Sequence, residues 1–416
     1  MTSNDTNPLE PKNALTFRSF FKQMGPAWIV SAVACGPATM ASVSLAGARF
    51  EYQLLWVIIL SALLAFVSQF MAAKLGLVTG KGIISLVDER LGEFWGWVLM
   101  IDALLATWLA STILMKAFVD VTALITGLSS PWWSLFYAAF VFLIVGVGGY
   151  KILEWVCKAL VSVVVICFVI TVIVVSPDLS KVMKGLIPTI PGGMDSALMM
   201  AGIMGGAVHI TIIAMHTYNV NSKGWGTGQM RLAWMDTFFS MFIAFGLYSV
   251  AIFLAAASAL HPEGIKVRTA LDLAKALKPF LGPYANVVFL AGLWGAVLST
   301  ITPTFLAAGY FLSDKLGWEL NVRDVRFRAV VLFGCLLSLI GPMLKGSFIH
   351  LLVIMLALGL CGTPIIILII LILLNKKDVV QENKNSLLLN VLGFLALLVT
   401  SLLASRFVLS KLGLWG

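Results

Sequence analysis

The sequence of 416 residues is poor in charge: only 11% of its residues are Asp, Glu, Lys or Arg, while 60% are hydrophobic. The mean hydropathy of +1.00 excludes an ordinary water-soluble domain. Cysteine is also scarce, and no CxxC pair occurs, so we expect neither a disulfide framework nor a cysteine metal cluster. The five cysteines are Cys35, Cys157, Cys167, Cys335 and Cys361. No HExxH motif or other catalytic constellation is present, so we predict no catalytic residues and no enzyme.

Long apolar runs take the place of the missing charges. Each is long enough to cross a bilayer, and lipid leaves the backbone no partner outside a helix, so we predict an all-α membrane protein. Residues 1–22 are polar and read as a cytosolic tail without a signal segment, and residues 23–416 as a single transmembrane domain. The predicted spans are 23–47, 52–77, 94–126, 131–149, 152–176, 195–220, 232–259, 284–313, 327–344, 347–374 and 386–411.

The net charge of +9 is distributed along the chain in a pattern typical of membrane proteins. Lys and Arg concentrate in alternate connections between spans, as the positive-inside rule predicts for cytosolic segments. We therefore expect a multi-pass protein of the cell (inner) membrane, with a cytoplasmic N-terminus and an extracellular C-terminus. The excess of basic residues is then explained by their position next to the lipid bilayer. We therefore expect no nucleic-acid partner.

Two of the predicted spans are interrupted near their centres. The first contains "ACGPAT" (34–39), and the sixth contains "GIMGGAVHITIIAMHTY" (202–218). Small residues also let membrane helices pack closely, which is the alternative explanation for either site alone. Broken helices five spans apart, however, are typical of transporters built from two inverted five-helix repeats. We expect such repeats over about 23–176 and 195–374, with an eleventh span added.

The breaks carry no charged side chain. Carbonyls at the end of a first half-helix suit cations, and amides at the start of a second half suit anions. His209 lies shortly after Gly205 and Gly206, and it is either a ligand or a hydrogen-bonded packing residue. Asp102 is an acid about two turns into the third span, where a role in a pathway and a role in helix packing both remain open.

These residues resemble the Nramp family of divalent-metal transporters. The first span, "GPAWIVSAVACGPATMASVS" (25–44), matches a family span that begins Gly-Pro-Ala and breaks at Asp-Pro-Gly-Asn. The segments "LSKVMKGLIPTIPGG" (179–193), "YKILE" (150–154) and "LSTITPT" (298–304) resemble family segments too. The resemblance covers nearly the whole chain, and it implies the LeuT-like fold with the first and sixth spans broken at the midplane.

The chain departs from the family where the resemblance would place metal ligands. Gly36 and Thr39 replace the aspartate and asparagine of the first break, and His209-Ile210-Thr211 replaces Met-Pro-His in the sixth span. The paired acids of the third span fall at Trp108 and Ser111, and the glutamine of the tenth span falls at Ala357. The chain is therefore similar to the Nramp-related magnesium transporters, a prokaryotic branch without the transition-metal site. The implied metal-site residues are Val33, Gly36, Thr39, Gly206, His209 and Thr211.

The sequence thus favours import of Mg²⁺, and also of Mn²⁺, as a largely hydrated ion by alternating access without proton coupling. Without a thioether, ligand softness no longer separates hard from soft ions, and Mg²⁺ gives up its waters reluctantly. Two other functions remain open: a proton-coupled Mn²⁺/Fe²⁺ transporter of the Nramp type, and a LeuT-fold carrier of a small organic solute. We expect no cofactor apart from the transported ion, and a chain that functions as a monomer.

Overall fold

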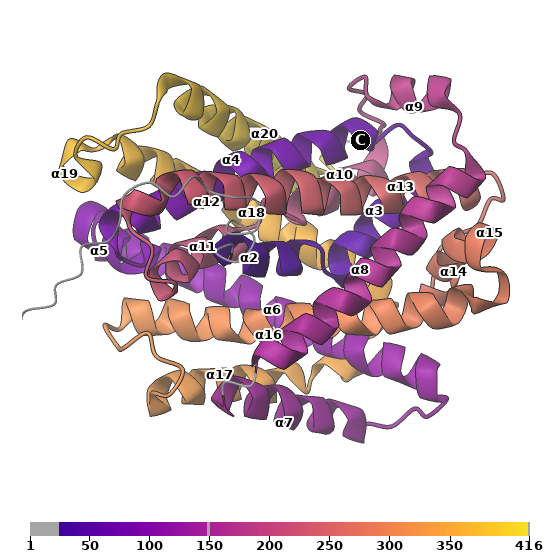
Figure 1. Cartoon of the computed structure of the whole chain (residues 1–416), viewed down its shortest axis with the longest axis horizontal. Coiled ribbons are helices and arrows are strands. Elements are labelled where there is room, and N and C mark those ends of the chain that lie inside the picture. The colour runs from indigo at the N-terminus through magenta and orange to yellow at the C-terminus, as the bar shows by residue number, and fades with distance from the viewer. Residues whose placement is uncertain (1–24, 148–149, 415–416) are drawn as a thin grey trace, which may run out of the picture.

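The computed structural model describes residues 25–147 and 150–414, and these ranges contain helices, turns and loops but no strand (Figure 1). The predicted cytosolic tail lies outside the described residues. Every predicted span coincides with a helix or an interrupted helix. These are α2 (Pro26–Ala34) with α3 (Pro37–Phe50), α4 (Leu55–Thr79), α6 (Glu93–Thr126), α7 (Trp132–Val147), α8 (Tyr150–Val175), α10 (Gly193–Gly205) with α11 (Ile210–Ser222), α12 (Met230–Thr237) with η2 (Phe238–Phe245) and α13 (Gly246–Ala259), α16 (Ala285–Lys315), α17 (Val325–Ser338), α18 (Phe348–Asn375) and α20 (Leu387–Lys411).

Short helices connect the spans. Within the described ranges, eight of the helical stretches are long and apolar enough to cross a membrane. The two amphipathic connecting segments, 80–92 and 269–282, contain short helices. The connecting helices are α5 (Ile83–Leu91), α9 (Leu179–Gly185), α14 (Ala270–Ala274), α15 (Lys278–Leu281) and α19 (Lys377–Val380).

The first span breaks because of a Gly-Pro pair. Pro37 is the first helical residue of α3, where its missing N–H would be unpaired anyway and its fixed φ suits the helix. Gly36 precedes it in an extended conformation, with φ −75° and ψ −179°. The sixth span breaks without a proline: α10 ends at Gly205, and His209 is extended, with φ −126° and ψ 138°.

The two breaks lie at the centre of the helix bundle. In Figure 1, α2, α11 and α18 occupy the middle of the view, and α7 and α20 lie towards opposite edges. The half-helices meet in pairs, because α2 packs on α11 and α3 packs on α10. α18 packs on both α10 and α3, and α16 packs on α2 and α3, so these two helices enclose the breaks.

Candidate functional site

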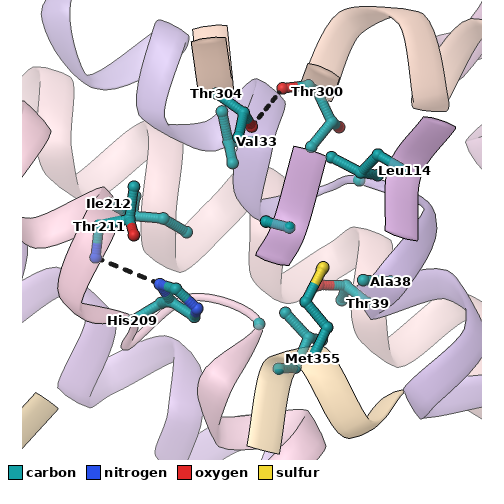
Figure 2. A pocket seen from close by; sticks show the side chains of 14 residues that line it. Val33, Ala38, Thr39, Leu114, His209, Thr211, Ile212, Thr300, Thr304 and Met355 are labelled. Atoms are coloured by element: carbon teal, nitrogen blue, oxygen red, sulfur yellow. Dashed lines mark hydrogen bonds between the residues drawn. The ribbon is translucent and has the colours of Figure 1, made fainter. Parts of the chain in front are cut away.

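A cavity of about 40 Å³ lies between the two breaks (Figure 2). Its walls come from α2, α3, α6, α11, α16 and α18 and from the break between α10 and α11. All six residues that the sequence implies for a metal site line it, although their role as ligands remains a prediction. The lining residues are Val33, Gly36, Ala38, Thr39, Ala110, Leu114, Gly206, His209, Thr211, Ile212, Thr300, Thr304, Met355 and Leu356.

Thr39 connects the two breaks. Its hydroxyl donates a hydrogen bond of 2.6 Å to the carbonyl of Ala34, the last residue of α2. The same oxygen lies 2.6 Å from the position where a Cβ on Gly206 would stand. Because the Thr39 hydrogen is used by Ala34, the lone pairs of its oxygen remain for a ligand in the cavity.

Gly36 is a glycine because the space beside it is filled. A Cβ on Gly36 would lie 2.6 Å from the Thr300 hydroxyl and 2.8 Å from the Val33 carbonyl oxygen. The Gly36 N–H donates to the Val33 carbonyl at 3.1 Å, and its own carbonyl accepts from the Tyr248 hydroxyl at 3.3 Å. In this conformation, therefore, there is no room here for the aspartate side chain found in the family.

His209 is the N-cap of α11. Its Nδ1 accepts the backbone N–H of Thr211 at 3.2 Å, and this bond assigns the imidazole hydrogen to Nε2. Nε2 lies against Gly359 of α18, where a side chain would collide with the ring. In this tautomer His209 offers the cavity a donor and no free lone pair, so the structure supports the capping role more directly than ligation.

A pair of hydroxyls joins the cavity to α6. The Oγ1 atoms of Thr211 and Thr107 are 3.3 Å apart, and Thr107 donates its hydrogen to the Ala103 carbonyl at 2.6 Å. Thr211 can therefore donate to Thr107. The two positions implied for the family's acids play no part in this contact: Ser111 donates to the Trp108 carbonyl at 2.9 Å, and Trp108 packs on Phe333.

Among the lining residues that sequence reasoning missed, three have a hydroxyl or a sulfur. Thr300 and Thr304 come from α16, inside the segment "LSTITPT", and Met355 comes from α18. Figure 2 shows the Met355 sulfur directed from α18 towards the other residues that line the cavity. The argument that the site lacks a thioether was therefore wrong, because a sulfur enters from the tenth span rather than the sixth. Ala357, the position implied by the family, is fully buried and does not line the cavity.

The cavity is electrically neutral apart from its backbone dipoles. None of its lining residues is Asp, Glu, Lys or Arg. In the part of the chain that the structure describes, no group of three or more His, Cys, Asp or Glu side chains is placed to hold a metal ion. Asp102 lies outside the cavity, with its carboxylate against Gly362 of α18. A cation at the site would therefore be held by carbonyls, hydroxyls and the thioether.

Comparison with known proteins identifies similar sequences over most of the chain. Residues 27–410 match the model of the family described as "Natural resistance-associated macrophage protein-like", or Nramp. A divalent metal cation transporter MntH from Caldanaerobacter subterraneus is 26% identical over 92% of this chain and 91% of its own length. A protein of the same name from Listeria welshimeri is 30% identical over 75% of this chain and 71% of its length.

Solved structures with the same arrangement of helices are more distant in sequence. The Eremococcus coleocola manganese transporter superposes with a TM-score of 0.75 at 18% identity, covering 97% of this chain and 93% of its own. Mhp1, a nucleobase-cation-symport-1 family transporter, gives a TM-score of 0.62 at 15% identity, with 97% and 96% coverage. These likenesses confirm the predicted LeuT-like fold of two inverted five-helix repeats and an eleventh span. With the match over residues 27–410, they show that this multi-pass membrane protein belongs to the Nramp family.

Proposed function

We propose that this protein carries divalent metal cations of the Mn²⁺ type across the cell membrane by alternating access, with the ion bound in the cavity between the breaks. The observation that carries the proposal is the convergence of two half-helix breaks, threonine hydroxyls and a thioether on one small cavity. The names of its relatives support the proposal, since they are divalent metal cation transporters and a manganese transporter.

The size of the cavity bears on how the ion is carried. A volume of about 40 Å³ has room for no more than a few water molecules, since a cavity needs at least about 10–15 Å³ to hold one. An ion in this conformation would keep only a few waters and would take its other ligands from the protein. Mg²⁺ dehydrates more reluctantly than most divalent ions, so the cavity favours Mn²⁺ over a largely hydrated Mg²⁺. Passage of the hydrated ion requires a wider conformation.

Transport of Mg²⁺ without proton coupling is the second candidate, favoured by the neutral lining of the cavity. A site without a carboxylate does not offset the free-energy cost of removing all the water from the ion. Such a site suits an ion that keeps part of its water shell. For either ion we propose the inner membrane, a cytoplasmic N-terminus and a monomeric unit, because each chain contains a whole cavity.

Uptake into proteoliposomes tests both candidates. We expect wild-type protein to take up Mn²⁺, and Mg²⁺ should compete with Mn²⁺ only at higher concentration. Thr39→Val removes one oxygen at nearly constant volume, and we expect it to raise the half-saturating Mn²⁺ concentration about tenfold, equivalent to about 1.4 kcal/mol. Thr400→Val is the matched control, because Thr400 is equally buried and bonds only to carbonyls of its own helix α20. Absence of divalent-cation uptake by the wild type would refute the proposal.

A further inference from the structure

The Met355 thioether reaches the cavity from α18, a continuous helix that packs directly against both broken spans. Met355 is 5% exposed and belongs to α18, which packs on both α10 and α3. The backbone of the neighbouring residue, Leu356, lies so close to Gly205 at the sixth-span break that a Cβ on Gly205 would collide with it. This close approach sets the height of Met355 along α18, so its sulfur lies level with the break.

Sulfur is chemically distinct among the groups that line the cavity. The other potential ligands from the lining residues are oxygen atoms of the backbone and of Thr39, Thr211, Thr300 and Thr304. The His209 Nδ1 is already used as a helix cap. Met355 is therefore the only soft donor among the lining residues that the structure describes.

Methionine also fills irregular gaps in apolar cores, and a gap-filling role predicts no effect on ion choice. Figure 2 argues for more than filling, because it shows the Met355 sulfur directed from α18 towards the other side chains that line the cavity. A thioether is a poor ligand for Mg²⁺ and Ca²⁺, which prefer oxygen, and a better one for softer divalent cations.

We infer that Met355 is a specificity-determining residue, whose sulfur contacts the ion directly and favours soft divalent cations such as Cd²⁺ over Mg²⁺ and Ca²⁺. This inference rests on the proposed function, since it assigns selectivity to the same cavity. It places the soft ligand on α18, a continuous helix, whereas the backbone oxygens come from the broken helices.

The test is the ratio of affinities for Cd²⁺ and Mg²⁺ in the purified full-length protein. Met355→Leu removes the sulfur at nearly constant volume, and such exchanges are well tolerated in packed interiors. We expect it to weaken Cd²⁺ binding at least about tenfold, the lower end of the losses seen when metal-site partners are changed. Mg²⁺ binding should stay within about twofold, well under the 1.4 kcal/mol that a tenfold change represents. Met241→Leu is the control, because Met241 is fully buried in η2 and does not line the cavity.

Two further measurements separate ligation from packing. X-ray absorption at the cadmium edge should show a sulfur neighbour in the wild type that is absent in Met355→Leu. Met355→Cys, which restores a sulfur, should recover part of the Cd²⁺ preference. An equal loss for Cd²⁺ and Mg²⁺ in Met355→Leu, or an unchanged ratio, would overturn the inference while leaving the proposed function intact. A wild type that neither binds nor transports a divalent cation would refute the proposed function itself.

Discussion

At the scale of single residues, the site depends on two glycines that have no side chain. Gly36 and Gly206 each allow a hydroxyl to approach, that of Thr300 in one case and that of Thr39 in the other. Neither glycine has a positive φ, since φ is −75° at Gly36 and −62° at Gly206, so space and not backbone conformation selects the residue.

Gly36→Ala is expected to destabilise the protein and to impair uptake. Its Cβ would meet the Val33 carbonyl, a backbone atom that cannot turn away, so α2 must shift against α3. Overpacking of this kind costs about 1–3 kcal/mol. Thermal unfolding in detergent and Mn²⁺ uptake measure the two effects. Gly192→Ala is the control, because no atom lies within 4 Å of its Cβ position. Equal melting temperatures for both variants would contradict the prediction.

Substitutions of His209 can distinguish a role as a helix cap from a role as a titrating group. His209→Ala removes the acceptor for the Thr211 N–H, and loss of an N-cap costs about 1 kcal/mol. His209→Asn retains an acceptor but cannot be protonated near neutral pH. If His209 acts as a cap, uptake should fall in the alanine variant and stay near wild type in the asparagine variant. If instead both variants lose a pH dependence that the wild type shows between about pH 5 and 8, imidazole titration is the function of His209.

At the scale of elements, the breaks were predictable and their surroundings were not. Gly-Pro and Gly-Gly pairs inside apolar runs are local signals, and their separation by five spans predicted the repeat. Met355 and Thr300 lie in helices that stay continuous in spite of Pro364 and Pro303, so no helix break marks their positions. They reach the cavity only because α16 and α18 pack across the breaks, and tertiary packing of this kind cannot be derived from spacing in one sequence.

A second element-scale contact fastens the connecting helix α5 to the bundle. Asp314, near the end of α16, accepts the backbone N–H groups of Ile84 and Ser85 at 3.0 and 3.1 Å. The same oxygen accepts the hydroxyl of Tyr218, in α11, at 2.7 Å. Lys315 adds an ion pair of 2.6 Å to Asp88 of α5. One carboxylate therefore holds α5 and the second half of the sixth span together.

We expect Asp314→Ala to release α5 and α11 from α16. Three donors lose a charged acceptor, and each hydrogen bond to a charged group contributes about 1.5–3 kcal/mol. Amide hydrogen exchange over residues 83–91 should accelerate, and cysteines introduced in α11 should become more reactive. Asp378→Ala removes the exposed ion pair with Arg90 and serves as the control, since such pairs contribute little. Unchanged exchange in Asp314→Ala would show that apolar packing alone holds α5.

At the scale of the whole molecule, the cavity lies where the two halves of the chain meet. α2 and α3 come from the first repeat, α11, α16 and α18 come from the second, and α6 completes the wall. In the proposed alternating-access mechanism, one repeat or helix bundle would move against the other around this cavity. No acid at the site links ion binding to a proton. The energy source for transport therefore has to be considered for the whole molecule.

We therefore predict transport without proton coupling. A proton-coupled carrier needs a titratable group at the ion and a relay away from it. Gly36 and Thr211 stand where the family resemblance would place groups at the site, and Trp108 and Ser111 where it would place the relay. The membrane potential alone supplies enough energy: one charge gains about 2.3 kcal/mol per 100 mV, and a divalent cation about 4.6 kcal/mol. At about 1.4 kcal/mol per factor of ten, this sustains an internal excess on the order of a thousandfold.

Asp102 is the residue through which coupling could survive. Its carboxylate lies against Gly362, and the His209 ring lies against Gly359, one helical turn away on the same face of α18. A proton passing between these groups would reach the edge of the cavity. The test is to set the potential of proteoliposomes with valinomycin, impose an Mn²⁺ or Mg²⁺ gradient, and follow internal pH with a dye. Potential-driven ion entry without acidification is the expected result. Acidification that accompanies ion entry and disappears in Asp102→Asn, while ion entry itself persists, would show that this acid replaces the lost relay.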